Sequence, residues 1–123
     1  VISIYNDINH TDMFKLFKEK EKKINSKELW NLDHTIVEWL VPRLKLFKEK
    51  TTGYPGDITW DEWMSILDKI ITGLEAYQAE RTWDDSVSKE VNMECDNIFY
   101  TQRNAEFQEA MQLLAKHFRS LWW

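Results

Sequence analysis

The sequence predicts an all-α protein, a compact bundle of about four helices that forms a single domain over residues 1–123. Only three glycines and two prolines interrupt the 123 residues, so breaks between elements are few. Apolar residues make up 43% of the chain, which is enough for a core of its own. In three long segments they recur every three or four residues, the spacing of one helix face. Helices with such faces bury them most simply against one another.

The first 25 residues predict an arm followed by a helix. The opening VISIYN is rich in residues that favour extended backbone, so a short edge strand or an unanchored N-terminal arm is expected there. Asn9 or Thr11 is expected to cap a first helix that ends near Lys23, because both side chains can accept an early helical N–H.

A second helix is expected to have Asn31 or Asp33 as its cap and to end near Lys50. Its apolar stripe consists of Ile36, Val37, Leu40, Val41, Leu44 and Phe47. Pro42 lies inside this pattern and predicts a kink, because proline removes a backbone donor and clashes with the preceding turn. The kink would either wrap the helix around a core or break it locally and expose the carbonyl of Glu38.

The third helix has the clearest start. A turn-rich stretch at residues 53–56 precedes Thr59, and Glu62 follows three residues later, which is the spacing of a capping box. Trp60 and Trp63 lie on the apolar stripe that continues to Tyr77, so both are expected in the core.

Residues 80–97 have weak periodicity and leave two alternatives, a long loop or a loop followed by a short helix that begins at Asp85 or Ser86. A last helix is expected from a second clear stripe. It consists of Phe107, Ala110, Met111, Leu114, Phe118, Leu121 and Trp122.

Composition favours a protein of the cytoplasm without a membrane span. The single cysteine, Cys95, cannot form an internal disulfide, and no apolar run approaches the roughly 20 residues that cross a bilayer. No signal peptide is visible before the first predicted helix. The net charge of −5 divides into +2 for residues 1–50 and −7 for residues 51–123. Because phosphate binding needs clustered basic groups, no direct nucleic-acid contact is expected.

Catalytic templates are mostly missing. There is no Gly-rich phosphate loop and no nucleophile elbow, so neither an enzyme nor a cofactor is expected. The three histidines are too scattered for a zinc motif: His10, His34 and His117. Two pairs of carboxylates are spaced so that each pair would lie on one helix face: Glu90 with Glu94, and Glu106 with Glu109. In all-α nucleotide pyrophosphatases, pairs of this kind bind Mg²⁺ through their oxygens. The second pair of that motif is absent after Glu109.

Seven tryptophans are more than a core of this size needs, so some of them are expected to bind a partner. Trp39 lies at the edge of its helix stripe, Trp83 lies in an acidic stretch, and two indoles end the chain. Exposed Trp and Tyr side chains tend to dominate the energy of protein interfaces. The predicted binding residues are Trp39, Arg43, Trp83, Asp84, Asp85, Trp122 and Trp123.

Residues 29–77 resemble a group of small uncharacterised proteins of tailed bacteriophages. The shared pattern is WNLDHTIVEWLVPRLKLFKE, then GYP, then TWDEWMSILDKIITGLEAY, and it covers about two fifths of the chain. The resemblance implies a phage origin and no specific activity. Arg43 and Asp68, which lie within this segment, are expected to pair across the second and third helices.

We therefore expect a small phage protein that binds a host protein in the host cytoplasm, as an inhibitor of a defence system or of a host enzyme. Its acidic segment from Asp57 to Glu109 suggests mimicry of nucleic-acid charge as one mode. A second hypothesis is a binder that sequesters a nucleotide-type signal between Trp39 or Trp83 and Arg43. A Mg²⁺-dependent pyrophosphatase is the third, and a homo-oligomer is compatible with all of them.

Overall fold

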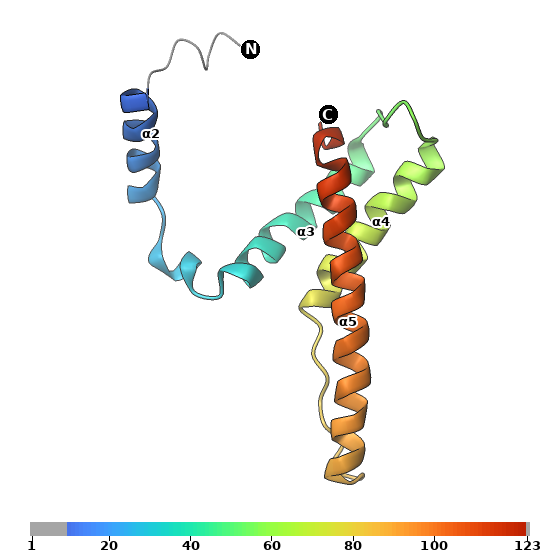
Figure 1. Ribbon diagram of the computed structural model, residues 1–123. Coiled ribbons are helices and arrows are strands. Elements are labelled where there is room, and N and C mark those ends of the chain that lie inside the picture. Colours follow the sequence, from blue (N-terminus) through green and yellow to red (C-terminus); the bar gives the residue numbers. More distant parts are fainter. Residues whose placement is uncertain (1–9, 123) are drawn as a thin grey trace. The chain divides into compact units, whose positions relative to one another are not determined.

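The computed structural model describes residues 10–122 and shows the predicted all-α fold (Figure 1). Within those residues it has four α-helices, two short 3-10 helices and no strand. The expected extended arm and Trp123 lie outside the described residues. The chain divides into two compact units, Val1–Thr35 and Ile36–Trp123, and each is described by itself below. The prediction of one domain over residues 1–123 stays a prediction.

The first unit contains α2 (His10–Lys22) and η1 (Ser26–Leu29). The predicted end of the first helix is correct to within one residue, but Thr11 lies inside the helix rather than at its cap. The side chain of Asn25 caps η1 by accepting a hydrogen bond from the backbone N–H of Lys27 at 3.0 Å. The cap lets the chain start η1 at a segment that contains no glycine or proline.

Helix α3 (Leu32–Lys50) begins one residue after Asn31, which has a φ of 52°. Asparagine tolerates this left-handed conformation better than most residues, so it can turn the chain into the helix. Asp33 lies in the first turn and is therefore not the cap, although its charge suits a helix N-terminus. The helix continues through Pro42 to Lys50, so the local break that the proline suggested does not occur.

Helix α4 (Trp60–Tyr77) starts with the predicted capping box. The Thr59 hydroxyl accepts the backbone N–H of Glu62 at 3.2 Å, and the Glu62 carboxylate accepts the backbone N–H of Thr59 at 3.3 Å. Trp63 is fully buried, as predicted. The core prediction for Trp60 is wrong, because its side chain is 38% exposed and lies edge-on against Tyr54, 5.9 Å between ring centroids.

Helix α5 (Lys89–His117) is longer than the sequence predicted, and η2 (Phe118–Ser120) follows it. Its cap is Ser88, whose hydroxyl accepts the backbone N–H of Val91 at 3.2 Å, so Asp85 and Ser86 do not begin a helix. The segment left open at residues 80–97 therefore contains a loop and the first turns of α5.

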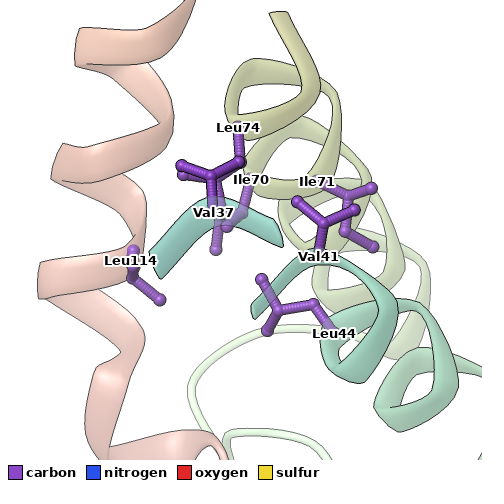
Figure 2. Close-up of a cluster of buried hydrophobic side chains, with 7 residues drawn as sticks. All are labelled: Val37, Val41, Leu44, Ile70, Ile71, Leu74 and Leu114. Carbon is purple, nitrogen blue, oxygen red and sulfur yellow. The ribbon is translucent and has the colours of Figure 1, made fainter. Parts of the chain in front are cut away.

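The core of the second unit lies where α3, α4 and α5 meet (Figure 2). Three side chains of α3 and three of α4 face one another, and α5 adds one from the other side. They are Val37, Val41, Leu44, Ile70, Ile71, Leu74 and Leu114. Their contact removes the apolar stripes of three helices from water, which is the main stabilising term of such a fold.

Helices α4 and α5 run antiparallel and approach most closely at Gly73. A Cβ atom on Gly73 would lie 2.5 Å from the backbone oxygen of Glu106 and still closer to the Cβ of Ala110. Trp63 meets His117 at one end of the pair, and Tyr77 packs on Phe107, 4.4 Å between ring centroids, towards the other. The glycine thus allows two backbones to touch where any larger residue would hold them apart.

Candidate functional site

The predicted binding residues lie at three separate places in the second unit. Trp39 and Arg43 are on α3, Trp83 is in the loop before α5, and Trp122 follows η2. Among residues 10–122 no hydrogen bond, ion pair or ring contact joins one place to another. Each place is therefore considered separately.

Trp39 and Arg43 form one compact unit on the surface of α3. The Arg43 guanidinium lies over the Trp39 ring, 4.2 Å from the ring centroid, and its Nη1 donates a 2.8 Å hydrogen bond to the Trp39 carbonyl. Residues four apart share a helix face, so this stacking follows from their spacing. The contact holds the indole in one orientation although 58% of the side chain is exposed.

Trp39 belongs to a second apolar face of α3 that points away from the core. Ile36, Trp39 and Leu46 are each exposed by half or more, and Arg43 and Lys50 share their side of the helix. We call these five residues the outer face of α3. The helix thus has two apolar faces, and only the one formed by residues such as Val37 and Leu44 is used by the core. An apolar strip of this kind on a surface is typical of an interaction site.

A shallow hollow lies at the C-terminal half of the outer face. It has a volume of about 200 Å³ and is lined by Arg43, Leu46, Phe47 and Lys50, with almost no polar atoms in its wall. The aliphatic stems of the two basic residues form two of its sides, because such side chains cover apolar surface while their charges remain in water. Pockets that hold drug-sized ligands are larger, about 300–1,000 Å³. The hollow is suited instead to one inserted side chain.

The charges on α3 are compensated on one side only. Lys45 pairs with Glu75 at 3.1 Å, and Lys48 pairs with Asp68 at 2.6 Å. Asp68 therefore pairs with Lys48 and not with Arg43, which corrects the pairing expected from the sequence. Within residues 10–122, Arg43 and the outer-face residue Lys50 have no carboxylate at salt-bridge distance. The outer face thus carries two positive charges without an anion.

The second place is around Trp83, in the loop of residues 79–88, which runs alongside α5 (Figure 1). A hydrogen-bond network of side chains holds this loop against the helix. Arg81 donates to the Asp96 carboxylate at 2.8 Å and to the backbone and side-chain oxygens of Asn92, each at 3.3 Å. The Trp83 indole N–H donates to the other oxygen of Asp96. The two loop side chains therefore share one carboxylate of the helix, and Trp83 has a structural role here.

Asn92 is the centre of this network. It is only 2% exposed, its amide donates to the carbonyls of Asp84 and Ser88 at 2.9 and 3.2 Å, and its oxygen accepts the backbone N–H of Asp84 at 3.0 Å. A buried amide with all these bonds fixes the loop, because leaving any of its groups unpaired would cost about 1–3 kcal/mol. The Asp84 carboxylate accepts both the N–H and the O–H of Ser86, whereas Asp85 is simply exposed.

Hydrogen bonds to both aspartates lower their pKa values. The Trp83 indole, with Arg81 as a second donor, lowers the pKa of Asp96 below its ordinary value of 3.8. The two donors of Ser86 lower the pKa of Asp84 in the same way. A carboxyl group whose pKa is lowered by folding stabilises the fold above its unfolded pKa, and it loses that contribution as the pH falls through the folded value.

We predict that the contact between Trp83 and Asp96 weakens only in acid. The NMR signal of the Trp83 indole N–H should be constant from neutral pH to about pH 4 and should then titrate with a midpoint below 3.8, as Asp96 takes up a proton. Asp96→Asn should abolish this titration, and the matched control Asp85→Asn should leave it unchanged. A midpoint above 3.8, or a titration that survives in Asp96→Asn, would contradict the network.

The third place is the C-terminal end. Leu121 packs against the core, whereas Phe118 before it and Trp122 after it in the sequence are exposed. Trp123 lies outside the described residues, so the predicted indole pair is described only in its first half. The binding role of Trp122 stays a prediction.

Comparison with known proteins adds no family. No family model, curated protein or solved structure matches the chain. The resemblance of residues 29–77 to small phage proteins therefore stays a prediction, and the function has to be inferred from the chain's own geometry.

Of the two carboxylate pairs predicted from the sequence, Glu106 and Glu109 have ordinary surface partners. Glu109 lies 3.8 Å from the amine of Lys69, and Glu106 accepts a hydrogen bond from Gln102 at 3.3 Å. In the part of the chain described, no group of three or more His, Cys, Asp or Glu side chains could hold a metal ion. No observation therefore strengthens the Mg²⁺-dependent alternative. Between His10 and Trp122, no helix is both long and apolar enough to cross a membrane.

Sequence reasoning found Trp39 and Arg43 but missed the surface to which they belong. Ile36 was assigned to the core stripe, Leu46 was placed only near the edge of that stripe, and Lys50 was not singled out. A signal was present, because α3 has more apolar residues than one face of a helix can bury. The residues Arg81, Asn92 and Asp96 were also missed, since their contacts join positions 11 to 15 apart in the sequence.

Proposed function

We propose that this chain is a small binding protein that docks a partner protein on the outer face of α3. The observation that carries the proposal is the second apolar face itself, formed by Ile36, Trp39 and Leu46 on a helix whose other face already closes the core. Burying a fully exposed apolar side chain stabilises by roughly 1.5–3 kcal/mol, and these three are about half exposed, so a partner gains roughly half of that value from each. Trp and Arg, adjacent here as Trp39 and Arg43, are the residues most often found at energetic centres of interfaces.

The partner that we propose is a host protein, and the setting is the cytoplasm of an infected bacterium. The support for this is the resemblance of residues 29–77 to small proteins of tailed bacteriophages, together with the lack of catalytic templates in the sequence. Inhibition of a host defence system or of a host enzyme fits a small chain that binds without chemistry of its own. Mimicry of nucleic-acid charge by the acidic residues 57–109 has no separate support from the site.

The nucleotide-trap hypothesis has weaker support. A base stacks on the flat face of an aromatic ring, but one face of Trp39 is already covered by its own Arg43. The indole N–H of Trp83 is bound to Asp96, and the hollow on α3 is smaller than ordinary ligand pockets. Protein docking uses the same residues without these obstacles.

A photo-crosslinking experiment tests the proposal. A benzoylphenylalanine is placed at Leu46, on the outer face, or at Gln112, an exposed polar position of α5 that serves as the matched control. After irradiation in bacterial cells, we expect a discrete adduct with one host protein from position 46 and none from position 112. Trp39→Ala should lower the yield at position 46.

Two results would contradict this function. The first is the absence of any adduct from position 46. The second is the same set of adducts from both positions, because this would show random collisions rather than docking on α3.

A further inference from the structure

The outer face of α3 has the width and length of a single helix contact. It is one stripe wide, and from Ile36 to Lys50 it extends about 21 Å at 1.5 Å per residue. Side chains that repeat every three or four residues form ridges and grooves into which the ridges of a second helix fit. The hollow between Arg43, Leu46, Phe47 and Lys50 is such a hole, and it is open to a single apolar side chain.

The backbone of α3 also favours a helical partner over an extended one. Apart from its two ends and the carbonyl of Glu38, to which Pro42 cannot donate, its N–H and C=O groups are used within the helix, so it offers no free edge to which a strand could add. An extended segment laid on this apolar face would leave its own backbone groups without partners on the buried side. A helix satisfies these groups internally and presents only side chains.

The charge of the outer face selects the kind of helix. Arg43 and Lys50 lack a carboxylate partner within residues 10–122, whereas Lys45 and Lys48, on other sides of the same helix, are paired with Glu75 and Asp68. Arg43 uses one of its five N–H groups for the Trp39 carbonyl, and the others can reach an incoming carboxylate. Acidic residues beside the apolar stripe of the partner would therefore be attracted, and basic residues would be repelled.

A second copy of the chain fits this face poorly. Arg43 lies midway between Ile36 and Lys50, so two outer faces related by a two-fold axis and packed antiparallel would place Arg43 against Arg43. The same packing would set each Lys50 against an apolar Ile36. Like charges at the centre of an interface disfavour such a pairing.

We propose that the outer face of α3 binds an acidic amphipathic helix of the partner protein. One apolar side chain of that helix fills the hollow, and flanking carboxylates pair with Arg43 and Lys50. The proposal rests on the docking function above and specifies the class of segment that the partner presents.

Three synthetic peptides of about 18 residues serve as probes for the intact chain. The first has leucines at helical spacing flanked by glutamates, the second has lysines in place of the glutamates, and the third is the first with a central proline. Binding is measured by fluorescence anisotropy of a dye on each peptide. We expect the acidic helix to bind roughly tenfold or more tightly than either of the others.

Charge reversal makes the test specific to the outer face. In the double variant Arg43→Glu with Lys50→Glu, the preference should invert, so that the lysine peptide binds more tightly. The control Lys116→Glu with Arg119→Glu makes the same change of net charge at two exposed positions, one in the last turn of α5 and one in η2, and should keep the acidic preference. Circular dichroism verifies that each variant has the helix content of the parent chain.

Several outcomes would overturn the proposal. Equal binding of the acidic and basic peptides, or an unchanged preference in the double variant, would show that Arg43 and Lys50 do not select an acidic partner. Tight binding of the proline peptide would show that the partner segment need not be a helix. A dimer of the parent chain in sedimentation that Leu46→Glu converts to a monomer would assign the face to a second copy. If no peptide binds but the adduct from position 46 forms, this proposal fails and the docking function stands; without the adduct, both fail.

Discussion

Gly73→Ala is expected to lower the free energy of unfolding by about 1–3 kcal/mol, the usual cost of forcing an extra methyl group into a packed core. The new Cβ would overlap the backbone oxygen of Glu106, at 2.5 Å, and the side chain of Ala110. A backbone atom cannot rotate aside, so α4 and α5 would have to move apart. This effect opposes the gain in helix propensity that alanine normally brings, about 1 kcal/mol.

Urea denaturation followed by circular dichroism measures this change. Gly53→Ala is the matched control, because a Cβ at that position meets nothing within 4 Å, and its stability should hardly change. Ala110→Gly should recover part of the loss when it is combined with Gly73→Ala, since it removes one of the two overlapping atoms. A variant Gly73→Ala as stable as the parent chain would show that α4 and α5 are not in close contact here.

Trp63→Ala is expected to have the larger effect of the two, a loss of about 3–5 kcal/mol. The indole is 0% exposed and lies edge-on against His117, 5.8 Å between ring centroids, so its removal leaves a cavity where α4 meets the end of α5. A loss of this size is comparable to the whole stability of many small domains, so the variant should be partly unfolded at 25 °C.

Two further variants separate packing from the polar group of Trp63. Its indole N–H has no hydrogen-bond partner within residues 10–122, so Trp63→Phe removes an unsatisfied donor while keeping most of the ring and should lose much less. Trp60→Ala, one turn earlier on the same helix, should also lose less because that side chain is 38% exposed. Equal losses for Trp60→Ala and Trp63→Ala in thermal unfolding would contradict the burial of Trp63.

The elements that sequence reasoning predicted well are those specified by local signals. Helix α4 is the clearest case, because Thr59 and Glu62 are three residues apart and cap the helix whatever the rest of the chain does. Its apolar stripe then continues without interruption to Tyr77, and the burial of Ile70 and Leu74 follows from the spacing alone.

The start of α5 could not be predicted, because the local signals before it do not specify the cap. Asp84 and Ser86 have the composition of a helix cap but bond to each other in a turn, and Ser88 caps the helix instead. The turn is held by Asn92, four residues into α5, which is polar and yet buried. Periodicity counts apolar residues, so a helix whose first buried residue is an asparagine shows no stripe there.

The candidate site was predicted only in part because spacing does not show which of two apolar faces finds a neighbour. Ile36 and Val37 are adjacent in the sequence and equally apolar, but only Val37 is buried by the core. For Trp83, the acidic stretch around it gave no sign that its indole N–H bonds to Asp96, and its role in binding a partner stays a prediction. Both outcomes depend on contacts between elements that are distant in the chain.

Hydroxyl-radical footprinting checks whether the outer face of α3 is open in the free protein. Oxidation of Trp39 and Trp63 in the intact chain is followed by mass spectrometry of the peptides that contain them. With side chains that are 58% and 0% exposed, Trp39 should be oxidised many times faster than Trp63. Equal protection of the two indoles would show that the face is already covered and would contradict the account.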